Sequence, residues 1–176
     1  MQPIIYDVAV SLDGFISGPG GDVTKFAHEG AVVDDYNARL RTYTTAIMGR
    51  RTYEFGYAYG LEPGMNPYPH MRSFVFSRGA DLPNDGDVTQ VSEGWLGHIS
   101  ALKTQSAGPI YLCGGGDFAG CLLEAGLIDR LILKRAPCVY GAGASLFGGR
   151  GTTRSFSRVD TKTYASGYIL DHLDVG

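Results

Sequence analysis

The chain has 176 residues, of which 44% are hydrophobic and 19% charged, and its formal net charge is −3. These values are typical of one globular domain, which we expect to span residues 1–176. The weakly acidic balance, without a run of basic residues, argues against a nucleic-acid partner. No apolar run approaches the ~20 residues of a membrane span, and Asp7 interrupts the apolar start of the chain, so we expect a cytoplasmic protein without a membrane partner.

The cysteines and histidines follow no disulfide or metal-binding pattern. The three cysteines are odd in number, lie in apolar surroundings and form no C-x-x-C pair, which favours reduced core thiols. The four histidines are scattered without the spacing of metal ligands. We therefore expect no bound metal.

Apolar patterns predict strands and helices that alternate along the chain. In the first part we expect, in order, a central strand at 4–10, a glycine-rich loop at 11–22, a helix at 34–45, a strand at 45–48, a helix from 49 to about 57 and a strand at 73–77. We then expect an edge strand at 88–91, a helix capped by Ser92, a strand at 110–113, a short helix at 118–125, a strand at 127–135, a glycine-rich loop at 137–150 and a hairpin of 153–159 with 164–173. This order is typical of a three-layer α/β fold with a mixed sheet and a C-terminal antiparallel hairpin.

The segment from 108 to 126, GPIYLCGGGDFAGCLLEAG, predicts a buried strand, a triple-glycine turn and an amphipathic helix. The glycines at 114–116 allow a turn without side chains in front of the first helical amides. Those amides have no intrahelical partner and lie at the positive end of the helix dipole, so a phosphate could bind there. The alternative is that the glycines only permit a tight turn, and this segment alone does not decide between the two.

Two further strand ends carry groups that favour anions. Arg50, Arg51 and Thr52 follow one predicted strand, and Arg78 follows the next. Ligands of α/β sheets gather at the carboxyl ends of the strands, so three such loops suggest one extended phosphorylated ligand, such as a dinucleotide. Taken singly, each arginine is more commonly a solvated surface residue.

Five segments in this order resemble the dihydrofolate reductase superfamily: VAVSLDGFIS, IMGRRTYE, FVFSR, YLCGGGDFAG and APCVYGAGASLFG. The resemblance is closest to the branch that contains the C-terminal domain of the riboflavin biosynthesis protein RibD, and it covers nearly the whole chain. It implies an eight-stranded, mostly parallel mixed sheet that binds NADP(H) in an extended pose.

The resemblance also implies which residues bind the cofactor. The backbone of Ala9 and Ile16 would hold the nicotinamide carboxamide. The phosphates would lie against three groups of residues: Gly49, Arg50, Arg51 and Thr52; Ser77 and Arg78, at the adenosine 2′-phosphate; and Gly114, Gly115, Gly116, Asp117 and Phe118. The family usually joins the first two glycines of the last group by a cis peptide. NADPH rather than NADH is expected, because arginine binds a 2′-phosphate through paired hydrogen bonds.

The substrate half departs from the family pattern. Folate reductases carry a W-x-L-P-x-D/E segment whose acid anchors the pterin, whereas this chain has VTKFAHEGAVVDDYN. Its spacing makes Asp34 or Asp35 the candidate acid, although both are also ordinary residues for a helix start. Lys134 aligns with a threonine that often assists that acid, and is the third catalytic candidate.

These observations predict an NADPH-dependent reductase that transfers a hydride to a small heterocycle resembling a pterin, a pyrimidine or a flavin precursor. The alternative is a non-catalytic dinucleotide-binding protein that retains the cofactor cleft. The resemblance further implies a homodimer.

Overall fold

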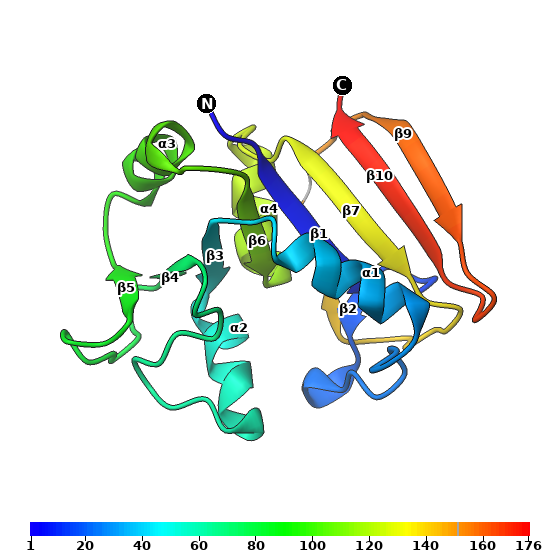
Figure 1. Ribbon diagram of the computed structural model, residues 1–176, viewed down its shortest axis with the longest axis horizontal. Helices are drawn as coiled ribbons and strands as arrows, with labels where there is room; N and C mark the ends of the chain where they lie inside the picture. Colours follow the sequence, from blue (N-terminus) through cyan, green and yellow to red (C-terminus); the bar gives the residue numbers. More distant parts are fainter. Residues whose placement is uncertain (151) are drawn as a thin grey trace.

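The computed structural model describes residues 1–150 and 152–176. Its main sheet has eight strands in the order β5-β4-β3-β6-β1-β7-β10-β9 (Figure 1). The strands are β1 (Ile4–Val10), β3 (Thr45–Gly49), β4 (Arg72–Phe76), β5 (Val88–Val91), β6 (Ile110–Gly114), β7 (Arg130–Arg135), β9 (Phe156–Thr163) and β10 (Ile169–Val175). β10 runs antiparallel to β7 and β9, and the other pairs are parallel. The predicted α/β fold with its C-terminal hairpin is confirmed.

Helices cover both faces of this sheet and give the fold its three layers. α1 (Ala31–Leu40) and α2 (Arg50–Phe55) pack on one face, and α3 (Trp95–Gln105) and α4 (Gly116–Glu124) pack on the other (Figure 1). Along β1, Ile4 and Tyr6 enter the core beneath α3 and α4, while Ile5 enters the core beneath α1. A parallel strand covered on both faces is apolar along most of its length, as β1 is. Asp7 is therefore an exception that requires a partner.

Two short features of the fold were not predicted. β2 (Phe15–Ser17) and β8 (Ala144–Ser145) form a separate antiparallel pair, which joins the two glycine-rich loops. The 3₁₀ helices η1 (Pro19–Gly21) and η2 (Gly56–Tyr59) follow β2 and α2. The long loop after β1 thereby becomes an ordered wall beside the carboxyl ends of the parallel strands.

Two helix starts differ from the sequence predictions. α1 begins at Ala31 and ends at Leu40, because Gly30, at φ 93°, forms the N-cap and a turn closes at Thr42. The prediction that Ser92 caps α3 is wrong, because the helix begins after Gly94, which is in the left-handed region and makes no side-chain cap bond.

The triple-glycine turn between β6 and α4 contains a cis peptide between Gly114 and Gly115, as the family resemblance implies. Gly116, the next residue, must be glycine for a different reason. A Cβ on Gly116 would overlap the carbonyl oxygen of Ser145, so α4 could not approach the β8 loop with any larger residue. α4 buries Ala119, Leu122 and Leu123 against the sheet.

Candidate functional site

The carboxyl ends of the parallel strands open onto two adjoining cavities. The larger, of about 900 Å³, lies between the starts of α2 and α4 on one side and β2, η1 and the β8 loop on the other. The smaller, of about 480 Å³, lies between β1, β6, β7 and α1. Both are lined by Val8, Ile16, Val23, Phe55 and Cys113, so they meet over these residues. A ligand in one cavity can therefore touch a ligand in the other.

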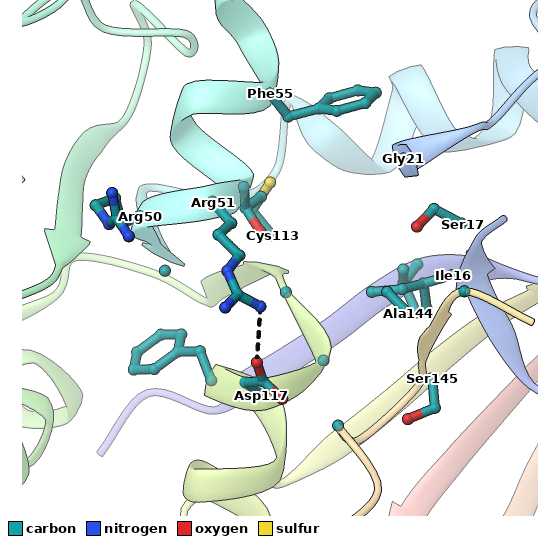
Figure 2. A pocket seen from close by; sticks show the side chains of 18 of the residues that line it. Ile16, Ser17, Gly21, Arg50, Arg51, Phe55, Cys113, Asp117, Ala144 and Ser145 are labelled. Carbon is teal, nitrogen blue, oxygen red and sulfur yellow. Dashed lines mark hydrogen bonds and ion pairs between the residues drawn. The ribbon is translucent and has the colours of Figure 1, made fainter. Parts of the chain in front are cut away.

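The larger cavity is rich in positive charge. Arg50, Arg51 and Arg78 line it, together with a single carboxylate, that of Asp117. Figure 2 shows Arg50 and Arg51 on one side of the cavity and Ile16, Ser17 and Gly21 across from them. Arg51 Nη1 lies 3.3 Å from Asp117 Oδ2, but both side chains are mostly exposed, so this ion pair is weak. A more highly charged anion can therefore replace Asp117 as the partner of Arg51. Arg78 makes no ion pair within the described residues.

The glycine turn forms part of the cavity wall. Gly115 and the first three residues of α4, at 116–118, line the cavity, and the amides of these helical residues have no intrahelical partner. A Cβ on Gly115 would lie 3.0 Å from Thr52 Oγ1, so even an alanine would crowd the gap between the two helix starts. The wall thus combines arginines, a hydroxyl and open amides, which is the chemistry that a pyrophosphate requires.

The smaller cavity is mainly apolar and aromatic, but a buried ion pair forms its floor. Asp7 on β1 is 1% exposed and Lys134 on β7 is 8% exposed. Lys134 Nζ donates to Asp7 Oδ1 at 2.8 Å. Arg39 of α1 donates from Nη2 to the same oxygen at 3.2 Å and from Nε to Oδ2 at 2.9 Å, and Tyr43 donates its hydroxyl to Oδ2 at 3.0 Å. Each carboxylate oxygen therefore accepts two hydrogen bonds.

This network shifts the pKa of both charged partners. Burial lowers the pKa of Lys134 below its usual value, while the Asp7 carboxylate opposes that effect. Burial alone would raise the pKa of Asp7, but the Lys134 ammonium and the Arg39 guanidinium hold it below its usual value. A lysine whose pKa is lowered and whose carboxylate partner keeps it charged is suited to donate a proton.

Tyrosines surround the ammonium group. Lys134 Nζ lies 3.7 Å from the centre of the Tyr36 ring. The hydroxyls of Tyr36 and Tyr111 are 2.8 Å apart, and the Tyr68 hydroxyl is 3.2 Å from Cys113 Sγ. Burial raises the pKa of Cys113, so its thiol is not activated as a nucleophile. Of these tyrosines, Tyr36 lies against Lys134, while Tyr68 and Tyr111 form part of the aromatic wall of the cavity.

Most of the predicted cofactor residues line the larger cavity, namely Ile16, Gly49, Arg50, Arg51, Thr52, Arg78, Gly115, Gly116, Asp117 and Phe118. Ala9 lines the smaller cavity instead. Ser77 and Gly114 line neither, and the Ser77 hydroxyl accepts hydrogen bonds from the amides of Gly79 and Ala80 within its own turn.

The three catalytic candidates lie in different parts of the structure. Lys134 lines the smaller cavity, whereas Asp34 and Asp35 line neither cavity. Asp35 accepts hydrogen bonds from Lys162 at 2.5 Å and from the Tyr164 hydroxyl at 2.6 Å, which ties α1 to the C-terminal hairpin. A catalytic role for either acid stays a prediction that the geometry does not favour.

Sequence reasoning missed the tyrosine shell and the role of Asp7. Asp7 left a signal, since it is a charged residue in the middle of an otherwise apolar central strand. The eleven tyrosines of the chain suggest a stacking pocket or an aromatic dimer surface, but composition alone does not separate the two. In the described part of the chain, no group of three or more histidine, cysteine or acidic residues is placed to hold a metal, and no helix is long and apolar enough to cross a membrane.

Solved structures with the same fold define the class of protein. A protein of Shewanella sp. PV-4 named for riboflavin biosynthesis superposes with a TM-score of 0.82 at 22% identity, over 100% of this chain and 99% of its own. A dihydrofolate reductase from Enterococcus faecalis, solved in complex with NADP(H), superposes with a TM-score of 0.69 at 16% identity, over 99% of this chain and 96% of its own. The fold is that of the dihydrofolate reductases.

The family model of the RibD C-terminal domain matches residues 2–170, and the chain therefore belongs to that family. The protein YwjB of Bacillus subtilis (strain 168), which is uncharacterized, is 32% identical over 147 residues, covering 83% of this chain and 82% of that protein. The resemblance predicted from the five segments is confirmed.

Proposed function

We propose that the protein is an NADPH-dependent reductase that delivers a hydride to a small ring compound. One observation carries this proposal: an arginine-lined cavity with an open glycine turn runs directly into an aromatic cavity that holds an ion-paired lysine. The phosphates of a dinucleotide would match the larger cavity, and its reactive ring would lie where the two cavities meet, beside a substrate in the smaller one. The name of the Enterococcus structure, a reductase in complex with NADP(H), supports the same assignment.

The residues of the larger cavity fit NADP(H) in particular. Arg50, Arg51 and the amides at the start of α4 would hold the pyrophosphate, and Arg78 would hold the 2′-phosphate. The cofactor would supply a hydride from its nicotinamide ring. Ile16 and Val8 lie where the two cavities meet and would keep water from that ring.

Lys134 would complete the reaction from the other cavity. Its ammonium faces the substrate space and is held by Asp7, so it can give a proton to the oxygen or nitrogen that receives the electron pair. A positioned acid of this kind contributes roughly a hundredfold to ten-thousandfold in rate.

A non-catalytic dinucleotide-binding protein is the second candidate. It is favoured by the position of Asp34 and Asp35 outside both cavities, since the acid predicted from the sequence does not reach the substrate space. The two candidates differ in one measurement. An enzyme consumes NADPH in proportion to the substrate reduced, and a binding protein does not.

The cofactor assignment is tested by Arg78→Ala, with Arg72→Ala as the matched control at the opposite end of β4. By calorimetry, wild type should prefer NADPH to NADH. Loss of Arg78 should weaken NADPH about ten- to a hundredfold, because a charge-assisted hydrogen bond contributes roughly 1.5–3 kcal/mol, and should change NADH little. The Arg72 variant should match wild type. Equal affinity of the wild type for the two cofactors would refute the assignment.

A further inference from the structure

The polarity of the smaller cavity limits the kinds of ligand that it can bind. Its walls are aliphatic and aromatic, and include Val8, Val33, Phe26 and Tyr168. Among the residues that line it in the described chain, the carboxylate is Asp7 and the lysine is Lys134, and the side chains of His28 and Asn37 are exposed. Away from these two exposed residues, recognition of a polar ligand group depends on the floor.

The floor offers no acceptor to a ligand. Both oxygens of Asp7 already accept two hydrogen bonds each, from Lys134, Arg39 and Tyr43, and its side chain is fully covered. A carboxylate has about four acceptor positions, so none is left for an amino or amidine edge. A ligand that must donate to a carboxylate has no partner here.

The floor does offer a donor. An ammonium has three N–H groups, and one of those on Lys134 is used by Asp7 while the Tyr36 ring covers another side. The side chain is 10% exposed, and it is exposed into the cavity. The hydroxyls of two tyrosines that line the cavity, Tyr36 and Tyr111, are hydrogen-bonded to each other. Lys134 thus supplies a charged donor at one point of a mainly apolar and aromatic space.

We propose that the smaller cavity takes an uncharged, largely apolar ring compound whose carbonyl oxygen accepts a hydrogen bond from Lys134. The inference rests on the proposed reductase function in one respect, that this carbonyl is the group to be reduced. A phosphate group does not fit the space, because its charged oxygens would need several donors and Lys134 is already paired with Asp7. A diamino heterocycle does not fit either, because Asp7 is saturated.

The reduction balances if the NADPH of the proposed function supplies the hydride and becomes NADP⁺. A hydride adds to the carbonyl carbon, the C=O electron pair moves to oxygen, and the Lys134 ammonium gives that oxygen its proton, which yields an alcohol. Lys134 is left neutral beside Asp7 and takes a proton back from solvent. Because Asp7 stabilises the charged lysine, it is a positioning residue for this step.

Three bicyclic probes of similar size test the polarity. Coumarin presents a carbonyl acceptor, umbelliferyl phosphate adds a phosphate ester to the same ring system, and diaminoquinazoline presents two amino donors. Binding is measured by calorimetry with saturating NADP⁺, which occupies the arginine-lined cavity, and again without nucleotide. Coumarin should bind at least tenfold more tightly than either of the others. Lys134→Met should weaken coumarin about ten- to a hundredfold, as expected for loss of one charge-assisted hydrogen bond.

The matched control is Lys162→Met, which removes a lysine from the ion pair with Asp35 outside both cavities and should leave coumarin binding unchanged. Tighter or equal binding of the phosphate ester or the diamine would overturn the proposal, and so would a lack of coumarin binding. The reductase assignment fails separately, if neither NADPH nor NADP⁺ binds. The ranking of the probes without nucleotide does not depend on that outcome.

Discussion

At the scale of single residues, the ion pair of Lys134 and Asp7 is the main charged feature of the smaller cavity. An isolated ammonium would lose its proton on burial, and an isolated carboxylate would gain one. Together, and with Arg39 and Tyr43 completing the network, both remain charged. Arg39 belongs to α1, so docking of this helix onto the sheet is what finishes the site.

The pH dependence of turnover should report Lys134. The pKa of its ammonium is lowered by burial, raised by Asp7 and Cys113 and lowered again by Arg39. Because the donor must be protonated, kcat/KM should be constant below this pKa and fall as the pH rises through it, at a pH below 10.5. Asp7→Asn removes the opposing carboxylate, so the fall should move to lower pH. Rates across pH are measured on a proven substrate, with circular dichroism to verify folding.

Lys134→Met should lower kcat/KM about a hundredfold or more and remove this alkaline limb. Asp34→Asn and Asp35→Asn serve as controls, since neither side chain lines a cavity. If the lysine variant keeps the wild-type rate and either Asn variant loses activity, the proton donor is one of the acids predicted from the sequence and not Lys134.

At the scale of elements, the loop that packs across α4 restricts which residues this helix can contain. The β8 loop passes over its first turns so closely that a Cβ on Gly116 would overlap Ser145, and a Cβ on Gly120 would overlap the carbonyl oxygen of Phe147. Glycine weakens a helix by about 1 kcal/mol relative to alanine. Close contact with the loop offsets that cost and closes one side of the larger cavity.

Gly120→Ala should therefore destabilise the protein, by roughly 1–3 kcal/mol, as overpacking usually does. Gly97→Ala is the matched control, because Gly97 lies in α3 with open space around its Cβ position, and should raise stability by about 0.5–1 kcal/mol. Urea unfolding of both variants measures the difference. A stabilised Gly120 variant would show that the loop does not rest on α4 in solution.

At the scale of the whole molecule, the homodimer expected from the family resemblance stays a prediction. Three aromatic side chains on α2 and η2, those of Phe55, Tyr57 and Tyr59, are 41%, 37% and 70% exposed. Aromatic residues are enriched where subunits meet, which favours association. Light scattering should give twice the chain mass of 18.9 kDa at micromolar concentration. A mass of one chain at every concentration would contradict the dimer.

The order of elements and the cofactor loops could be predicted from the sequence, because both depend on local patterns. Alternating apolar runs and glycine turns specify strands and helices through neighbours in the chain. Parallel strands then bring their carboxyl ends to one edge wherever the sheet forms, so the sequence alone predicts that Arg50, Arg78 and the glycine turn converge, as they do around the larger cavity.

The substrate space was decided only by tertiary structure. Asp7, Arg39 and Lys134 come from β1, α1 and β7, and their charges are compatible only because packing brings them within hydrogen-bond distance. The same packing turned Asp35 toward Lys162 and away from both cavities. A side chain's burial and partner depend on elements far away in the chain, so residue type and spacing indicated an acid near the start of α1, whereas the docking of α1 on the sheet made a lysine the group that faces the ligand.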